Sequence, residues 1–233
     1  MTALRLTEFA TREAASQQAA EIVAGALGGD IMSTGRAVLM VSGGSTPTAM
    51  FEALSACDLA WHKVTVGLVD ERWVAPEHPA SNEGLVRRHL LKHRAGAAGL
   101  VPLKTSDDDP WQARQDRDSA YAPHCGALSM LVLGMGADGH TASWFPGDPD
   151  LAEVAGASNP GCVAGVHAPL AAIPQRMTLT GSAVFRARRA LMLAFGDDKR
   201  DVLQAAVAAD PLTYPVRYAM DGLGDRLSIY WAA

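Results

Sequence analysis

The chain has 233 residues, of which 48% are hydrophobic and 19% are charged, and its formal net charge is −5. This balance is typical of a globular protein and excludes an intrinsically disordered chain. The acidic net charge argues against general affinity for nucleic acid, so we expect no nucleic-acid partner. An anionic ligand would have to be held by cations that are concentrated locally.

Cysteine usage and hydropathy indicate a cytoplasmic protein. Cys57, Cys125 and Cys162 are odd in number and widely spaced, which favours reduced thiols and argues against a structural zinc site. No run approaches the roughly 18 apolar residues of a membrane span. Glu8 and Arg12 interrupt any apolar leader at the N-terminus. We expect no membrane partner and a monomer, with weak self-association left open.

Apolar runs alternate with amphipathic stretches along the chain. Short apolar runs without polar alternation are typical of strands that are buried on both faces of a parallel sheet. The strand candidates cover residues 37–41, 64–69, 128–133, 162–166, 190–195 and 227–231, with an extended segment over 176–180. The predicted helices cover residues 7–27, 48–55, 81–91 and 111–121, and a further one begins at 196–197. This order predicts an α/β fold with a doubly wound, mostly parallel sheet, helices on both faces, and a single domain over 1–233.

Turn and capping residues predict where several of these elements begin and end. Gly28 and Gly29 are expected to end the first helix. Thr46 as N-cap and Pro47 as the first helical residue are expected to begin the second. Residues 148–160 are predicted to form a loop.

A glycine-rich turn, Ser-Gly-Gly-Ser-Thr-Pro over residues 42–47, follows the strand predicted over 37–41. Such a turn at a helix N-terminus presents free N–H groups and the positive end of the helix dipole, which suits a phosphate. Ser45 and Thr46 add hydroxyl donors beside Gly43 and Gly44. An ordinary strand–turn–helix connection is the alternative. No Gly-x-Ser-x-Gly surrounds Ser45, which excludes the nucleophile elbow of an α/β-hydrolase.

Three basic residues are candidates for contacts to an anion. Arg72 ends the charged triplet Asp-Glu-Arg after a buried strand, and its guanidinium suits phosphate or carboxylate, although a solvated loop is the alternative. Lys199 lies in the first turn of a predicted helix, where the dipole disfavours a cation. This position indicates an anion beside the helix start. Arg176, at the start of the extended segment, is a further candidate.

The stretch 131–147 carries the clearest indication of catalysis. A buried strand leads into glycines at positions 134, 136 and 139, and Asp138 and His140 lie where the carboxyl end of a parallel strand opens into a crevice. A histidine that is oriented by a carboxylate can act as a general base at neutral pH. The glycine spacing also matches a dinucleotide-binding fingerprint. Pro146 and Pro149 leave no room for the long helix which that fingerprint requires.

Taken in order, these motifs resemble those of the 6-phosphogluconolactonase family over nearly the whole chain. The most specific part is Asp-Gly-His-Thr-Ala-Ser over 138–143. Trp144 is a departure, because the family more often has leucine there, and the region after Asp210 matches only loosely. The matching segments are 42–47, 70–72 with Ser81 and Asn82 downstream, 133–147, 176–180 and Gly-Asp-Asp-Lys over 196–199.

The resemblance implies a Rossmann-like fold, shared with sugar-phosphate isomerases and deaminases, and no metal or organic cofactor. It implies hydrolysis of 6-phospho-D-glucono-1,5-lactone to 6-phosphogluconate in the oxidative pentose phosphate pathway. By this similarity His140 activates a water that attacks the lactone carbonyl, and Asp138 supports it. The residues implied to hold the phosphate are Gly43, Gly44, Ser45, Thr46, Arg72 and Lys199, with Arg176 as a less specific contact.

Two other functions share parts of this pattern. A glucosamine-6-phosphate deaminase-like isomerase has similar glycine and Asp-Gly-His elements, but it also carries a glutamate soon after the histidine. Here no acidic residue occurs between His140 and Asp148, so the second acid–base group is missing. A non-catalytic sugar-phosphate sensor could use the same fold. The retained Asp138 and His140 and the lack of a DNA-binding segment argue against a sensor.

Overall fold

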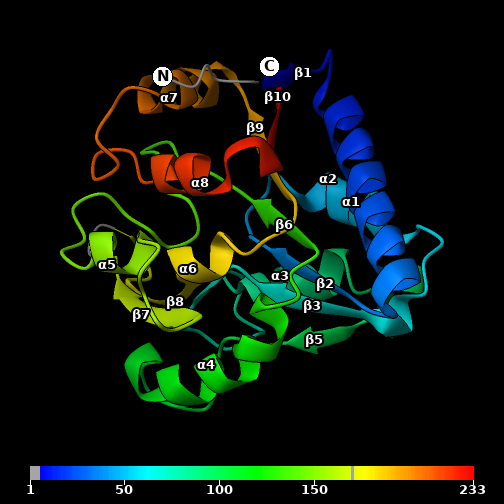
Figure 1. Ribbon diagram of the computed structural model, residues 1–233, viewed down its shortest axis with the longest axis horizontal. Coiled ribbons are helices and arrows are strands. Elements are labelled where there is room, and N and C mark those ends of the chain that lie inside the picture. Colours follow the sequence, from blue (N-terminus) through cyan, green and yellow to red (C-terminus); the bar gives the residue numbers. More distant parts are fainter. Residues whose placement is uncertain (1–5, 169–170) are drawn as a thin grey trace.

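The computed structural model describes residues 6–168 and 171–233 and contains two β-sheets (Figure 1). The seven-stranded sheet has the order β1-β10-β9-β6-β2-β3-β5, and its neighbouring strands are all parallel. The three-stranded sheet has the order β4-β8-β7 and is antiparallel. Residues 1–5 and 169–170 of the domain predicted over 1–233 lie outside the described residues. The strands are β1 (Leu6–Glu8), β2 (Ala37–Val41), β3 (Val64–Leu68), β4 (Asp70–Arg72), β5 (Gly99–Val101), β6 (Met130–Leu133), β7 (Val163–His167), β8 (Gln175–Leu179), β9 (Ala190–Phe195) and β10 (Leu227–Ala232).

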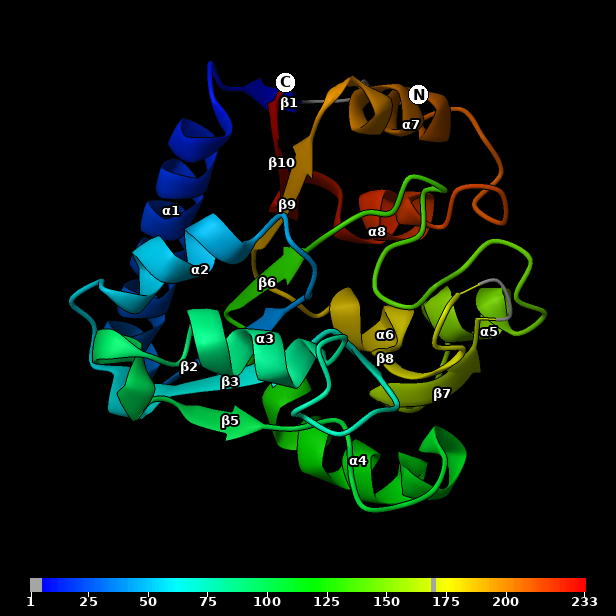
Figure 2. The same cartoon turned by 180° about the vertical axis from the view of Figure 1, so that it is seen from behind.

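Helices cover both faces of the larger sheet, which confirms the predicted doubly wound α/β class. Figures 1 and 2 show α1 and α2 on one side and α6, α7 and α8 on the other. In the described part of the chain, no helix combines the length and the apolar character needed to span a bilayer. The helices are α1 (Arg12–Thr34), α2 (Thr48–Ser55), α3 (Asn82–His89), α4 (Pro110–Cys125), α5 (Leu151–Ala155), α6 (Gly181–Val184), α7 (Asp197–Ala206) and α8 (Val216–Leu223), with short 3-10 turns at Trp61–Lys63, His93–Ala97 and Gly224–Arg226.

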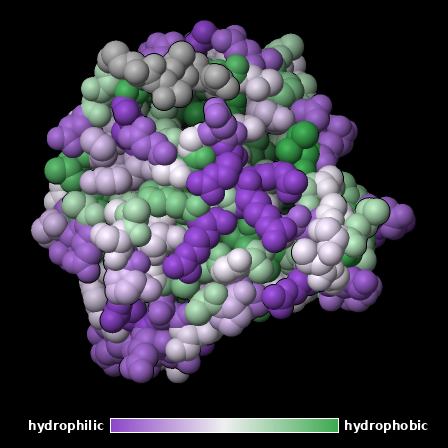
Figure 3. Space-filling view, in the orientation of Figure 1, coloured by the Kyte–Doolittle hydropathy of each residue, from purple (hydrophilic) through white to green (hydrophobic). Residues whose placement is uncertain are grey.

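The central strands of the larger sheet form the middle of the hydrophobic core. Every residue of β2 and β6 is buried, and Leu39 and Leu131 have no exposed surface. Burial on both faces explains why these strands are continuous apolar runs without polar alternation. On the face that Figure 3 shows, hydrophilic side chains gather near the middle and the hydrophobic areas are small and separate. Apolar side chains are thus concentrated between the layers.

The prediction for the first helix is wrong at both ends. Thr7 belongs to β1, and α1 begins at Arg12, where the Thr11 side chain caps it by accepting a bond of 3.1 Å from the backbone N–H of Ala14. The helix passes through Gly28 and Gly29 and ends at Thr34, with Gly35 as its C-terminal cap, a position that its φ of +80° suits. Tertiary packing over the long buried face of α1 outweighs the roughly 1 kcal/mol that an interior glycine costs relative to alanine.

Two other local predictions also need correction. Pro47, not Thr46, is the N-cap of α2, and no side chain caps this helix. The backbone N–H of Thr48 instead donates to the carbonyl of Ser45 at 3.3 Å, so the turn itself closes the helix start. The loop expected over 148–160 contains the short helix α5. The small antiparallel sheet was not predicted, because β4 consists of three charged residues.

Glu71 in β4 anchors the start of α3. Its side chain has no exposed surface. One carboxylate oxygen accepts the backbone N–H groups of Arg72 and Asn82 at 2.7 and 2.8 Å. The other accepts the Ser81 hydroxyl at 2.9 Å and the backbone N–H of Glu83 at 2.7 Å. Burial raises the pKa of Glu71 and these four donors oppose the rise, so the donors compensate for placing a carboxylate inside the protein.

We expect Glu71→Gln to destabilise the protein. The glutamine amide has only one oxygen, and its NH₂ group is a donor that faces the donors previously bound by the second carboxylate oxygen. Each buried donor left without an acceptor costs about 1–3 kcal/mol. Urea unfolding measures this loss. Glu77→Gln, on the exposed loop after β4, is the matched control and should change the free energy of unfolding by less than about 0.5 kcal/mol. Equal stabilities for the two variants would contradict the anchoring role of Glu71.

Candidate active site

Four turns at one edge of the larger sheet bring most of the predicted site residues together. They follow β9, β6, β2 and β3, which are consecutive in the sheet. Because parallel strands end at the same edge, this is where α/β proteins bind ligands. In the order of the strands, the turns and the segments after them carry Lys199, His140, Gly43 and Arg72.

His140 and Asp138 form a hydrogen-bonded pair in the turn after β6. The His140 Nδ1 lies 2.6 Å from the Asp138 Oδ1, which also accepts the backbone N–H of His140 at 3.2 Å. Gly136 makes this approach possible, since a Cβ there would lie 2.1 Å from Nδ1. The His140 side chain is 29% exposed, and among the described residues its Nε2 has no hydrogen-bond partner. The ring is therefore held at one nitrogen and open at the other.

His140 lowers the pKa of the Asp138 carboxyl. Partial burial raises its pKa, but the hydrogen bond and the charge of His140 outweigh burial and hold that pKa below the ordinary value. Lys199, in the first turn of α7, interacts electrostatically with the same carboxylate. Burial lowers the pKa of the Lys199 ammonium, and Asp138 and Asp198 oppose this effect. The turn after β6 thus carries a histidine–carboxylate pair, and α7 supplies a cation that interacts with it.

Phe145 connects the turn after β6 to Arg176 in β8. Its ring centroid lies 4.4 Å from that of His140, and the Arg176 guanidinium lies 5.1 Å from the same phenyl ring. Arg176 is buried, donates through Nε to the carbonyl of Ile173 at 3.1 Å, and lies 3.8 Å from the Asp70 carboxylate. A stacked guanidinium is fixed in orientation, which suits recognition of a planar or tetrahedral anion.

Arg72 and Arg176 lie opposite each other in the β4–β8 pair. Arg72 donates through Nη1 to the carbonyl of Ala80 at 2.5 Å, while its buried Nε has no partner among the described residues. Burial lowers the pKa of Arg176; Asp70 opposes this, and the charge of Arg72 lowers the pKa further. Asp70 and Glu71 both interact with the Arg176 guanidinium, so two carboxylates orient this arginine pair, whose planar groups suit an anionic ligand.

The glycine turn after β2 presents unpaired backbone donors. In the described part of the chain, the N–H groups of Gly43, Gly44, Ser45 and Thr46 have no hydrogen-bond acceptor. Gly44 has a φ of +94°, a conformation that glycine adopts without strain. The Ser45 side chain is exposed. This arrangement is suited to an oxyanion, as the sequence predicts.

Several residues that complete the site were missed in the sequence. Asp70 accepts the Ser143 hydroxyl at 2.6 Å, and the Thr178 hydroxyl accepts the backbone N–H of Ser143 at 3.2 Å. Phe145 links His140 to Arg176, and Asn82 lies between Asp70 and Gly43. Strand alternation could have placed Asp70 on the face of Arg72 and Glu71 on the other, but nothing in the charged triplet identifies it as a strand.

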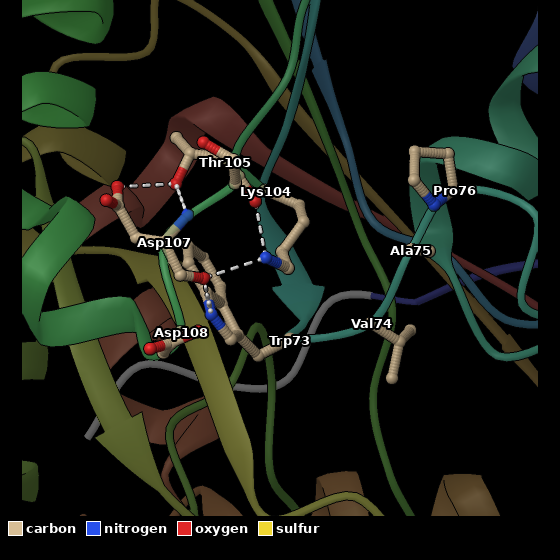
Figure 4. A pocket seen from close by; sticks show the side chains of 9 residues that line it. Trp73, Val74, Ala75, Pro76, Lys104, Thr105, Asp107 and Asp108 are labelled. Atoms are coloured by element: carbon tan, nitrogen blue, oxygen red, sulfur yellow. Dashed lines mark hydrogen bonds between the residues drawn. The ribbon is translucent and has the colours of Figure 1, made fainter.

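A cavity of about 550 Å³ lies beside the loop that follows Arg72 (Figure 4). The Lys104 ammonium lies 4.4 Å from the Trp73 ring centroid and donates to the carbonyl of Asp107 at 3.0 Å. None of the predicted site residues lines this cavity.

Among the described residues, no group of three or more histidine, cysteine, aspartate or glutamate side chains is arranged to hold a metal ion.

Comparisons with known proteins agree with the sequence motifs. A family profile described as glucosamine-6-phosphate isomerases/6-phosphogluconolactonase matches residues 10–228. The 6-phosphogluconolactonase of Mesorhizobium japonicum is 43% identical over 202 residues, which cover 87% of this chain and 84% of that protein. That of Rhizobium meliloti is 40% identical over 225 residues, or 96% and 97% of the two chains. The crystal structure of a 6-phosphogluconolactonase from Shewanella baltica superimposes with a TM-score of 0.95 at 33% identity and covers 100% of this chain and 99% of its own.

We expect His140→Ala to raise the pKa of the Asp138 carboxyl above its wild-type value, because the hydrogen bond and the charge of His140 then no longer oppose burial. In the wild type the lowered pKa means that the carboxylate stabilises the fold at neutral pH, and that this contribution is lost as pH falls through the lowered pKa. Titration of the carboxyl carbon by NMR measures the shift. His62→Ala, on the exposed turn before β3, is the control. If Asp138 keeps its wild-type pKa in both variants, the hydrogen bond between His140 and Asp138 does not lower that pKa and the prediction is wrong.

Proposed function

The chain belongs to the glucosamine-6-phosphate isomerase/6-phosphogluconolactonase family, and we propose that it hydrolyses 6-phospho-D-glucono-1,5-lactone to 6-phospho-D-gluconate in the oxidative pentose phosphate pathway. The observation that carries this proposal is the 2.6 Å pair of His140 and Asp138 at the strand edge, with cations on either side. The relatives named 6-phosphogluconolactonase support the substrate class. The roles given below to individual residues are our inference from the geometry.

His140 is the proposed general base. Since Asp138 holds Nδ1–H, Nε2 carries the lone pair and can take a proton from a water molecule as that water attacks the lactone carbonyl. The imidazolium that forms is stabilised by Asp138. Collapse of the tetrahedral intermediate breaks the bond to the ring oxygen, which receives the proton from Nε2. The new carboxylic acid then loses its proton to solvent, so one water is consumed and His140 returns to its neutral form.

The glycine turn and the cations are proposed to hold the phosphate end of the substrate. The free N–H groups of residues 43–46 and the Lys199 ammonium supply donors from two neighbouring turns of the same edge. Arg72 and Arg176 add guanidinium groups from the small sheet. Anchoring the phosphate fixes the far end of the sugar and orients the carbonyl towards the water. All of these groups belong to one chain, so we propose that a monomer is sufficient for the reaction.

His140→Ala should lose most turnover and bind 6-phosphogluconate nearly as well as the wild type does. A positioned general base contributes roughly 10²–10⁴-fold to the rate, and the imidazole is not itself one of the groups proposed to contact the phosphate. The measurement is production of 6-phosphogluconate from freshly generated lactone, corrected for spontaneous hydrolysis. His89→Ala, whose ring pairs with Glu52 on α2, is the control. Unchanged turnover in His140→Ala would overturn the base assignment, and a wild type without activity would overturn the function and direct attention to deaminase chemistry.

Arg72→Ala should chiefly weaken substrate binding. A charge-assisted contact to phosphate contributes about 1.5–3 kcal/mol, so KM should rise roughly 10- to 100-fold while kcat changes little. Arg94→Ala removes an exposed arginine that pairs with Asp58, and its KM should equal that of the wild type. A fall in kcat at constant KM would show that Arg72 does not anchor the phosphate.

A further inference from the structure

Asn82 is a buried polar residue to which the proposed mechanism assigns no task. It is the first residue of α3, is 2% exposed, and belongs to the Ser-Asn segment that the sequence motifs include. Its side-chain amide donates through Nδ2 to the backbone carbonyl of Asp70 at 2.8 Å and to the Asp70 carboxylate at 3.2 Å. One end of this side chain is therefore fixed to β4.

The other end of the amide lies against the glycine turn. A Cβ at Gly43 would be 1.9 Å from the Asn82 Oδ1 and 2.3 Å from its Cγ, so the amide occupies the space that a side chain at position 43 would need. Oδ1 is buried and accepts no hydrogen bond from any described residue. A buried amide oxygen that receives no hydrogen bond is costly to keep, which indicates that its position serves a purpose other than stability.

Asp70, which accepts hydrogen bonds from Asn82, also contacts two other parts of the site. Its second carboxylate oxygen accepts the Ser143 hydroxyl at 2.6 Å, three residues after His140 in the chain, and lies 3.8 Å from the Arg176 guanidinium. Asn82 therefore sets the distance between the donors of the glycine turn and the side chains held by Asp70. Two sets of donors can bind one phosphate together only if the distance between them matches the size of the phosphate. Small displacements of either set therefore weaken binding.

We propose that Asn82 is a positioning residue that holds the Gly43 turn in register with the Asp70–Arg176 pair, so that both address the same phosphate. This inference rests on the proposed function. Asparagine is suited to the task because it combines a donor for Asp70 with a compact oxygen against Gly43. Aspartate has the same shape but no donor, and it would place a second carboxylate beside Asp70 and near the phosphate.

The test compares steady-state kinetics of Asn82→Asp with those of the wild type. We expect KM for the lactone to rise at least tenfold while kcat stays within about threefold, and the affinity for 6-phosphogluconate, measured by calorimetry, to fall in parallel. Ser81→Ala is the matched control, because it removes the N-cap of α3 and a partner of Glu71 but leaves the Asn82 contacts intact. Its melting temperature should fall while its KM stays at the wild-type value.

A second pair of variants tests the same contact from the side of the turn. Gly43→Ala displaces the Asn82 amide and should raise KM, whereas the double variant Gly43→Ala/Asn82→Ala has room for the new methyl group. If the contact positions the turn, the double variant has a KM no higher than that of the worse single variant. Effects that multiply, or an Asn82→Asp enzyme with wild-type KM and product affinity, would overturn the inference. Failure of wild-type hydrolysis would instead overturn the proposed function, and calorimetry with 6-phosphogluconate would still decide the role of Asn82.

Discussion

The site depends on two buried carboxylates that project from opposite faces of one short strand. In β4, Glu71 faces α3 and satisfies the donors at its start, while Asp70 faces the site and bonds to Asn82 and Ser143. Each carboxylate is surrounded by donors, which is the condition under which a charge can be buried. Because one backbone carries both, the position of α3 and the position of Arg176 are fixed together.

The electrostatics of the molecule follow from this arrangement. A chain with a net charge of −5 brings an arginine pair and a lysine to the candidate site, where Asp70 and Glu71 interact with Arg176 and Asp138 and Asp198 interact with Lys199. These carboxylates orient the cations. The anionic substrate that we propose would meet these local cations rather than the bulk charge of the chain.

The larger sheet and most of the site could be predicted from the sequence because apolar runs identify buried parallel strands, and parallel strands end at one edge. The pair His140 and Asp138 follows from that rule. The small sheet could not be predicted, since β4 is polar and its partner β8 lies about a hundred residues later. Contacts such as that of Asn82 with Gly43 arise only from tertiary packing. The end of α1 was mispredicted because local glycine signals were outweighed by the same packing.

The pairing of β1 with β10 has a consequence for how the chain folds during synthesis. In the described structure, Leu6–Glu8 joins the larger sheet only through Ile229–Trp231, and the backbone N–H of Phe9 adds a bond of 2.9 Å to the carbonyl of Trp231. A contact between segments more than two hundred residues apart carries a large loop-closure entropy and forms slowly. Residues 229–231 must therefore be synthesised before Leu6–Glu8 can pair with them, so this strand stays without its partner while more than two hundred residues are added.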